Sequence, residues 1–386
     1  MLDDYKLELS ELKNSSGEPA HTMATTYEYN SLNQMIARQS PDEGRTEYVY
    51  RKDGQIRFSE NAKQRADGWQ GSFSYTNFDA LGRPVEIGTF KSGGNSADRY
   101  FQNMTEAPIN SRSTHHIINN IYNPSSSVAD GLDDSYCKDQ NFIKYDLADP
   151  DFATTTGLSV ANYKQSFLRG NISKTSNDYV TTWYSYDDLG RVRWAVRKLD
   201  GAGVKTINYS YGPNGQVKES VYQKEVPSER FYHRFQYDIQ GRLLKVLTST
   251  DRVNWLEQAQ YTYDPLGRVK RVELADDLQG VDYVYTLDGK LKSINHPSME
   301  LEKDPGEDRV ATSSHKRFAP DVFSMSLDYY NQDYLREGTY INYGNNTGNH
   351  HNGLVKSWRW NLRTNSTQTF NRQETYNYTY DQHGWL

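Results

Sequence analysis

Cysteine is almost missing from this sequence, and its scarcity excludes one class of fold. The 386 residues contain a single cysteine, Cys137, so no disulfide bond can form within the chain. A small secreted domain stabilised by a disulfide framework is therefore excluded. Nucleophilic catalysis by Cys137 would need a partner histidine and an electropositive setting, which the sequence does not show. We expect a small, buried apolar side chain at this position.

Long apolar runs and clusters of basic residues are also missing. No stretch approaches the about 18 apolar residues that cross a bilayer as a helix. Residues 1–12 are charged and lack the apolar core of a secretory signal. Lysine and arginine number 44 against 50 aspartates and glutamates, for a net charge of -6, and the basic residues are scattered. We therefore expect no membrane insertion and no nucleic-acid partner, because nucleic-acid binding needs a basic face.

Hydrophobic residues are few, whereas tyrosine is abundant. Hydrophobic residues make up 35% of the chain and the mean hydropathy is -0.91, values that favour disorder. Aromatic residues nevertheless make up 13%, including 31 tyrosines, and disordered segments are poor in aromatics. Tyrosine favours strands, buries a large ring and keeps its hydroxyl for a polar partner or water. The composition therefore predicts a half-wet β-structure built on tyrosine.

A repeat with the pattern Tyr-x-Tyr-Asp-x-x-Gly-Arg-Leu/Val runs through the middle of the chain. Five consecutive copies occur, and their glycines are separated by 22 to 26 residues. The third copy has Phe235 at the first tyrosine position, and two copies replace the aspartate. The repeat residues are Tyr184, Tyr186, Asp187 and Gly190; Tyr209, Tyr211 and Gly215; Tyr237, Asp238 and Gly241; Tyr261, Tyr263, Asp264 and Gly267; and Tyr283, Tyr285 and Gly289.

The spacing within one copy predicts a β-hairpin. Tyr184 and Tyr186 lie two residues apart, so they share one face of a strand. Asp187 can begin a type I turn by accepting hydrogen bonds from the backbone ahead of it. Gly190 supplies the left-handed residue that closes a short hairpin loop, and Val192 returns on the second strand. Because aspartates recur at this turn position, we expect them to shape turns and not to catalyse.

A hairpin cannot bury its own face, so each copy needs neighbours for stability. Hairpins added side by side form one long, mostly antiparallel sheet, and its twist makes a long sheet curl. The predicted fold class is all-β, with repeated antiparallel hairpins in a long curled sheet and one irregular insertion.

The repeats also suggest how the chain is organised. Looser copies at Tyr48–Ile56, Tyr75–Val85 and Tyr27–Ile36 predict N-terminal repeats over residues 1–90, with Asn33 in place of the turn glycine in the last of these. Residues 91–180 read as an irregular insertion with a short helix over 158–167, and residues 181–295 as the main array. Residues 296–386 read as an irregular connection followed by further, truncated repeats. The chain ends inside a repeat, so we expect it to be a segment of a longer protein.

The pattern resembles the YD-repeat or Rhs (rearrangement hotspot) family, over Tyr184–Leu291, Tyr27–Val85 and Tyr378–Leu386. This resemblance implies strands wound into a hollow β-shell, as in bacterial polymorphic toxins, the shells of insecticidal toxin complexes and animal teneurins. It further implies an exported protein, secreted or at the cell surface, whose shell encloses a C-terminal toxin or other cargo polypeptide. Its partners would be that cargo or other subunits of a surface or secretion complex.

No motif in the sequence predicts catalysis, a cofactor or a metal site. Nucleophile elbows, phosphate-binding loops and dinucleotide fingerprints are missing. The pairs His115–His116 and His350–His351 are poor chelators, because adjacent residues on a strand point to opposite faces. We therefore expect a non-catalytic structural protein without cofactor or metal.

Two tryptophans leave a different function open. Trp358 and Trp360 lie two residues apart and would share one strand face, where their rings could stack against a sugar. Packing across the sheet is the simpler role for these rings. The alternative hypothesis is a cell-surface module that recognises a glycan or a partner protein through aromatic faces.

Overall fold

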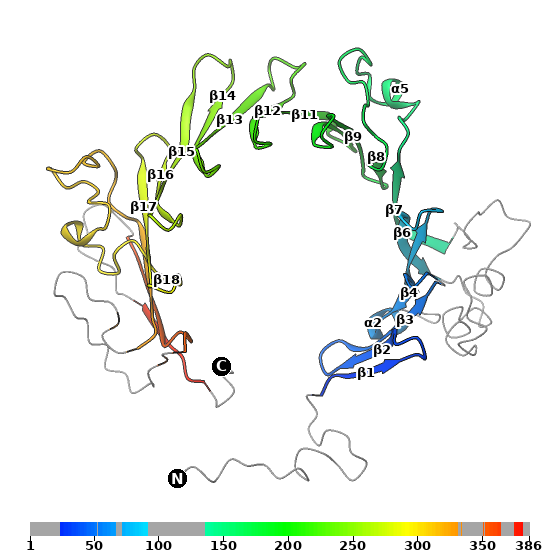
Figure 1. The fold of residues 1–386 in the computed structure, drawn as a ribbon, viewed down its shortest axis with the longest axis horizontal. Helices are drawn as coiled ribbons and strands as arrows, with labels where there is room; N and C mark the ends of the chain where they lie inside the picture. The colour runs from blue at the N-terminus through cyan, green and yellow to red at the C-terminus, as the bar shows by residue number, and fades with distance from the viewer. Residues whose placement is uncertain are drawn as a thin grey trace, which may run out of the picture. The chain divides into compact units, whose positions relative to one another are not determined.

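The computed structural model describes residues 24–51, 53–66, 72–91, 136–330, 333, 350, 352–363 and 374–380. The chain divides into two compact units, residues 1–205 and 206–386. Within each unit, successive hairpins follow one another along the chain (Figure 1). No helix in the described ranges is long and apolar enough to cross a membrane.

Antiparallel strands make up the first unit. Each strand pairs with the next one along the chain, from β1 to β10. The elements are β1 Thr26–Tyr29, β2 Met35–Ser40, β3 Gly44–Tyr50, β4 Ile56–Glu60, α2 Ala62–Ala66, β5 Ser72–Phe78, β6 Pro84–Lys91, β7 Cys137–Tyr145, α5 Phe152–Thr156, β8 Ile172–Ser176, β9 Val180–Tyr186 and β10 Val192–Leu199.

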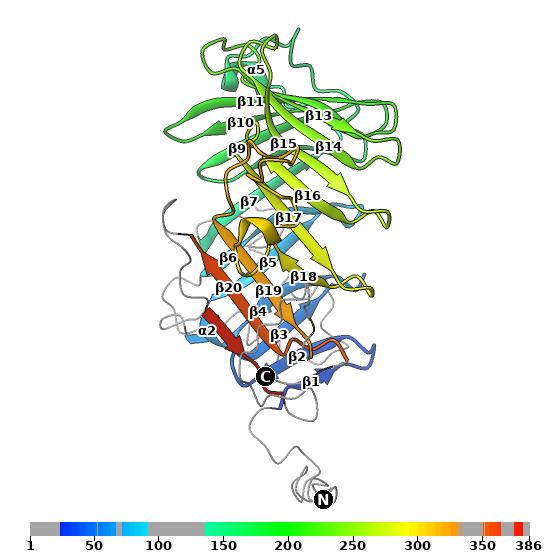
Figure 2. The same cartoon turned by 90° about the vertical axis from the view of Figure 1, so that its left-hand side faces the viewer.

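Strand β11 begins at the end of the first unit and ends in the second. From β12 onward, the second unit also pairs successive strands antiparallel. Figure 2 shows its strands β13 to β20 side by side with alternating directions. In the described part of this unit, the paired strands are neighbours along the chain. The elements are β11 Gly203–Tyr211, β12 Val217–Tyr222, β13 Phe231–Tyr237, β14 Leu243–Ser249, β15 Leu256–Tyr263, β16 Val269–Leu274, β17 Gln279–Tyr285, β18 Leu291–Ile294, η3 Leu301–Lys303, β19 Phe323–Asp328, β20 Ser357–Leu362 and β21 Glu374–Asn377.

Each repeat hairpin carries the same irregularity next to its turn. The pairing shifts between Gln236 and Tyr237, and Tyr237 then lies opposite Leu243. An identical shift precedes Tyr263, which lies opposite Val269. A β-bulge at a fixed place holds the register of every hairpin, because a slip of one residue would turn each side chain to the other face. The prediction of an all-β fold of antiparallel hairpins is confirmed; the curl of the whole sheet stays a prediction.

Two apolar cores lie in the first unit. Val49, Phe58, Phe73, Tyr75, Phe90 and Cys137 form one of them. Cys137 is buried, as its sequence setting suggested. Phe152, Tyr163, Trp183, Trp194 and Val196 form the other, and it joins the sheet to the segment between β7 and β8.

The structure corrects the position of the short helix. Residues 158–167 contain no helix, and α5 lies just before them at Phe152–Thr156. Gly157 has a left-handed φ of 71° and ends the helix, so the apolar residues after it belong to a loop. Tyr163 is nevertheless buried against Trp194 with ring centroids 5.5 Å apart. The apolar spacing that suggested a helix reflects burial of a loop on the sheet.

Strands also run through part of the predicted insertion. β7 and β8 pair antiparallel, and Asp146 and Gly170 stand at the two ends of the segment that joins them. The Gly170 backbone N–H donates to Asp146 Oδ1 at 2.6 Å, which links the two ends of this enlarged turn. In the described part of residues 91–180, the irregular segment therefore sits inside a hairpin turn. Residues 92–135 of the predicted insertion lie outside the described residues.

Candidate functional site

An aspartate side chain closes the turn at the tip of each full repeat. Asp264 Oδ1 accepts hydrogen bonds from the backbone N–H groups of Leu266 and Arg268, each at 2.9 Å. Asp264 Oδ2 accepts a hydrogen bond from Arg268 Nε at 2.7 Å. Gly267 has φ 82°, a conformation that favours glycine. The arginine four residues on makes the same two contacts with Asp79, Asp187 and Asp238.

Hydrogen bonds decide the charge state of these aspartates. Desolvation acts to raise the pKa of Asp264, but the backbone and side-chain hydrogen bonds from Arg268 outweigh it. The net pKa therefore lies below its ordinary value of 3.8. A carboxylate that is held ionised by its own turn serves as a structural anchor and is a poor proton donor at neutral pH.

The second tyrosine of a repeat ties it to the preceding repeat. Tyr263 donates its hydroxyl hydrogen to the carbonyl oxygen of Leu243 at 2.7 Å, and Tyr237 donates to Val217 at 2.9 Å. In each case the acceptor lies two residues after the turn glycine of the preceding repeat. We call this set the tyrosine ladder; its donors are Tyr50, Tyr145, Tyr186, Tyr237, Tyr263, Tyr329 and Tyr380.

The turn arginines stack on a tyrosine ring of the next repeat. The guanidinium of Arg242 lies 4.4 Å from the ring centroid of Tyr263, and that of Arg268 lies 4.7 Å from the ring of Tyr285. Arg83 lies in the same way 4.2 Å from Tyr145. Each arginine thus pairs with the aspartate of its own turn and stacks on the next repeat. Sequence reasoning missed this role, although the arginine recurs directly after the glycine.

The predicted repeat residues take recurring places along the hairpins. The turn glycines Gly190, Gly215, Gly241, Gly267 and Gly289 have φ between 77° and 90°. The first tyrosines Tyr184, Tyr209, Tyr261 and Tyr283 are half-buried on their strands, as are Tyr211 and Tyr285, whereas Tyr186 is buried. The residues are distributed one set per repeat, which suits a structural role.

The two tryptophans lie two residues apart on β20 and so share one face of that strand, as predicted. Trp358 and Trp360 are half-buried, while Arg359 between them is buried. Trp358 lies opposite Tyr376 on β21, and the two rings stack with centroids 5.5 Å apart and an interplanar angle of 20°. The predicted surface consisted of Trp358 and Trp360, whereas the ring that stacks on Trp358 is that of Tyr376.

Of the four histidines in the two pairs, the structure describes only His350. His115, His116 and His351 lie outside the described residues. The rings of His350 and Tyr380 pack edge to face, with their centroids 5.0 Å apart. This contact is a packing role.

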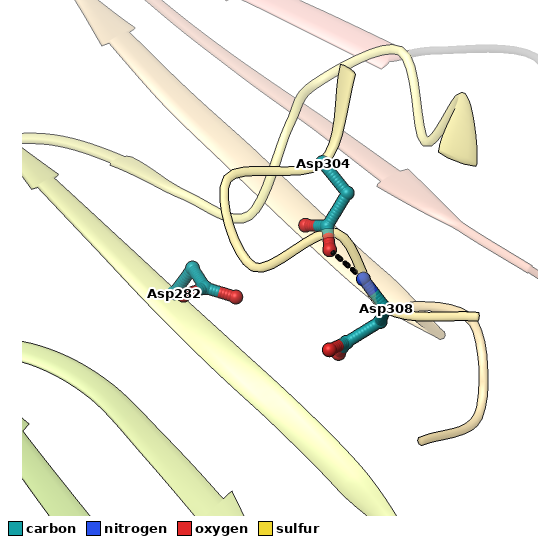
Figure 3. Close-up of side chains that lie close together, drawn as sticks. All are labelled: Asp282, Asp304 and Asp308. Carbon is teal, nitrogen blue, oxygen red and sulfur yellow. Dashed lines mark hydrogen bonds between the residues drawn. The ribbon is translucent and has the colours of Figure 1, made fainter. Parts of the chain in front are cut away.

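An unexpected group of carboxylates lies in the second unit. Asp282 projects from β17, whereas Asp304 and Asp308 belong to the connection between β18 and β19 (Figure 3). One carboxylate oxygen from each of the three lies within 4.8 Å of the others. The backbone N–H of Asp308 donates to Asp304 Oδ2 at 2.8 Å, which holds these two residues together. We call Asp282, Asp304 and Asp308 the aspartate cluster.

Arg271 is the cation that contacts the aspartate cluster in the described structure. It lies opposite Asp282 in the β16–β17 register, and its Nη1 is 2.5 Å from Asp282 Oδ2. Its Nη2 is 2.5 Å from Asp308 Oδ1, and its Nε is 3.0 Å from Glu273 Oε1. A Cβ at Gly306 would collide with the Arg271 guanidinium and the Asp282 carboxylate, so a larger residue there would force these side chains to shift.

Asp321 adds a fourth buried aspartate to this region. Its carboxyl group is within hydrogen-bonding reach of Asp304, and burial together with the Asp304 and Asp308 carboxylates raises its pKa strongly. Burial also raises the pKa of Asp282 to about 7, against the lowering effect of Arg271. At neutral pH the region therefore resists carrying all of its negative charge.

Sequence reasoning missed the aspartate cluster because its members are far apart along the chain. Asp304 and Asp308 lie in the predicted irregular connection, where acidic residues look solvated. Asp282 lies in a repeat strand at a position that the repeat pattern leaves variable. Only the register that places Asp282 beside Arg271 brings them together. The four-residue spacing of Asp304 and Asp308 around a glycine was the one available signal.

The fold is similar to part of a solved toxin assembly. A crystal structure of TcdB2-TccC3 without its hypervariable C-terminal region matches 95% of this chain, with a TM-score of 0.53 and 12% identity. A Tc holotoxin pore from Photorhabdus luminescens matches 92% of the chain with a TM-score of 0.35 and 13% identity. No protein-family model and no curated protein matches the sequence. The chain spans 14% of the TcdB2-TccC3 chain. At 12% identity, the similarity shows a shared β-fold alone.

Proposed function

We propose that this chain is a non-catalytic segment of the shell of a large exported YD-repeat protein, which encloses or shields a polypeptide such as a C-terminal toxin. The tyrosine ladder carries this proposal. The most regular residues of the chain bond one repeat to the next, from Tyr50 to Tyr380, and are spread along its length. Residues that recur in every repeat build a wall, whereas a catalytic group is needed only once.

Two further observations support the proposal. The fold is shared with part of a TcdB2-TccC3 structure, at 12% identity. The chain spans a small part of that protein, in agreement with a segment of a longer shell. A shell protein of this kind would be secreted or carried at the cell surface, with its own cargo or further subunits of a secretion complex as partners.

Limited proteolysis of the full-length parent protein tests the enclosure. The C-terminal segment of the parent is digested in place and as an isolated polypeptide, under the same conditions. We expect cleavage to be much slower in place, because the wall keeps protease from the enclosed chain. A fusion of the same segment to an unrelated domain is the control for the effect of a covalent neighbour. Equal cleavage in all three forms would contradict the proposal.

A recognition module remains the second candidate function, because of one observation on β20 and β21. Trp358 and Tyr376 stack with their rings nearly parallel, and Tyr376 is 53% exposed. Such a partly exposed pair can accept a sugar ring or a flat apolar side chain. Binding to a glycan array that is lost in Trp358→Ala and retained in Trp255→Ala would favour recognition over enclosure. Trp255 is the control because its ring already lies against the Arg234 guanidinium, 3.7 Å from its centroid.

A further inference from the structure

The aspartate cluster carries more buried negative charge than its neighbours balance. Asp282, Asp304, Asp308 and Asp321 are each at least nine-tenths buried. Arg271 contributes one positive charge, and Glu273 shares it. His315 lies 3.4 Å from Glu273 through Nε2, while its Nδ1 contacts the carbonyl oxygen of Gly306, which accepts a hydrogen bond from it. Buried carboxylates without a counterion are costly, so protons or a further cation must neutralise them.

Three carboxylate oxygens in this region lack a hydrogen-bond partner. They are Oδ1 of Asp304, Oδ2 of Asp308 and Oδ1 of Asp321, and none of them has a partner among the described residues. Native proteins leave few buried polar atoms unsatisfied, and an ion is one of the groups that satisfies them. Asp321 is an independent sign, because it lies outside the cluster and its own buried Oδ1 has no hydrogen-bond partner among the described residues.

The spacing of the oxygens fits one divalent cation. Ca²⁺ binds carboxylate oxygens at about 2.3–2.6 Å, so two of its ligands can lie up to about 5 Å apart. The three cluster oxygens lie within 4.8 Å of one another. Mg²⁺ gives up its water reluctantly and is usually held by one or two carboxylates, whereas three buried carboxylates form the kind of oxygen-rich site that suits Ca²⁺. We propose that Asp282, Asp304 and Asp308 bind Ca²⁺ in preference to Mg²⁺ and that the ion fixes the connection between β18 and β19 to β17.

Arg271 leaves room for this ion. Its guanidinium engages Asp282 Oδ2 and Asp308 Oδ1, whereas the unsatisfied atoms are Asp308 Oδ2 and Asp304 Oδ1. Arg271 therefore orients two of the carboxylates from one side, and their remaining oxygens are available to the ion. The same division of a carboxylate between a metal and an outer partner is common in metal sites. Asp321 can complete the ligand set directly or through water.

Calorimetric titration of the chelator-treated full chain with Ca²⁺, and separately with Mg²⁺, tests the proposal. We expect one Ca²⁺ per chain and weaker Mg²⁺ binding. Asp304→Asn and Asp308→Asn should each weaken Ca²⁺ binding about tenfold or more, since each removes a charged ligand. Asp276→Asn is the matched control, because Asp276 is exposed with φ 52°, a conformation that asparagine tolerates. This control should bind Ca²⁺ as the unchanged chain does.

A second measurement on the unchanged chain does not depend on the variants folding. Arg309 lies on the exposed side of the connection, one residue after Asp308, and offers a trypsin site. We expect millimolar Ca²⁺ to slow cleavage there several-fold and to raise the melting temperature, because the ion binds the folded connection. If Ca²⁺ neither binds nor slows cleavage, protons balance the cluster and the proposal is wrong. Unchanged binding in both asparagine variants would place the ion elsewhere and would equally overturn it.

Discussion

The hydroxyl group of Tyr263 makes one hydrogen bond, to the carbonyl oxygen of Leu243 in the preceding repeat. Tyr263→Phe removes this bond and keeps the ring that Arg242 covers. We expect the free energy of unfolding to fall by about 1 kcal/mol, because the partly buried carbonyl loses its partner. Urea denaturation measures the change. Tyr261→Phe is the matched control, since no hydrogen bond of the Tyr261 hydroxyl is found in the described structure, and it should change stability little.

The turn aspartates make stability depend on pH at the acid end. The pKa of Asp264 is lowered in the folded chain, so its contribution is fully present above the ordinary pKa of 3.8. That contribution is lost as the pH falls through the lower, folded pKa. We therefore expect Asp264→Asn to be less stable than the unchanged chain at pH 7 and the difference to shrink below about pH 4. Denaturation curves across this range measure it; a difference that grows on acidification would contradict the assignment.

Two of the five turns lack an aspartate at the position where the other three have one, and one of these two has glycine there. Gly212 occupies it, in Gly212-Pro213-Asn214-Gly215, although the backbone closes the turn in the usual way, with Gly212 N–H donating to Gln216 at 2.9 Å. Gly212→Asp should stabilise the chain by about 0.5–1 kcal/mol. The new carboxylate can accept hydrogen bonds as Asp264 does, and the unfolded chain loses glycine's freedom.

Thermal denaturation compares this variant with Gly215→Asp in the same turn. Gly215 has φ 85°, and aspartate is strained there, so Gly215→Asp should lower the melting temperature while Gly212→Asp raises it. If both variants lower it, the side-chain bonds of the aspartate do not stabilise these turns.

At the scale of the hairpin, the sequence was sufficient to predict strands and turns but not their attachments. Tyrosines two residues apart and a glycine four residues on define a strand end and a tight turn by local geometry alone. The residues that hold α5 in place follow no such local rule. Asp149 Oδ2 accepts hydrogen bonds from Trp183 Nε1 and Lys174 Nζ, each at 2.7 Å, across tens of residues.

The aspartate cluster likewise depends on contacts between distant residues and not on a local sequence pattern. Its members become neighbours only in the folded chain, where the register of β16 and β17 places Asp282 opposite Arg271. A periodic pattern can predict that strands pair, but the variable positions within the repeat decide what meets across them. The fold class was therefore accessible from the sequence, whereas this site required the three-dimensional pairing.

Within each unit, the strand pairings and the tyrosine ladder join a repeat only to the repeats beside it. Stability in such an array is a sum of repeat and nearest-neighbour contributions, so damage should spread to adjacent strands and no further. This differs from a single cooperative domain, in which any destabilised residue raises opening everywhere.

Gly241→Val tests this localisation. Gly241 has φ 83°, and a Cβ there would lie 2.8 Å from Gln216 Nε2, so the variant should lose more than about 1 kcal/mol of local stability. We expect amide hydrogen exchange, followed by mass spectrometry, to quicken in β12 to β15 and to stay unchanged in β3 to β6 of the first unit. Gly212→Ala is the control, because its Cβ would make only an ordinary contact, 3.9 Å from the Gln216 carbonyl oxygen, and its φ lies outside the left-handed region. Exchange that quickens equally throughout both units would show a chain that opens as one body and would contradict a wall built from neighbour-to-neighbour contacts.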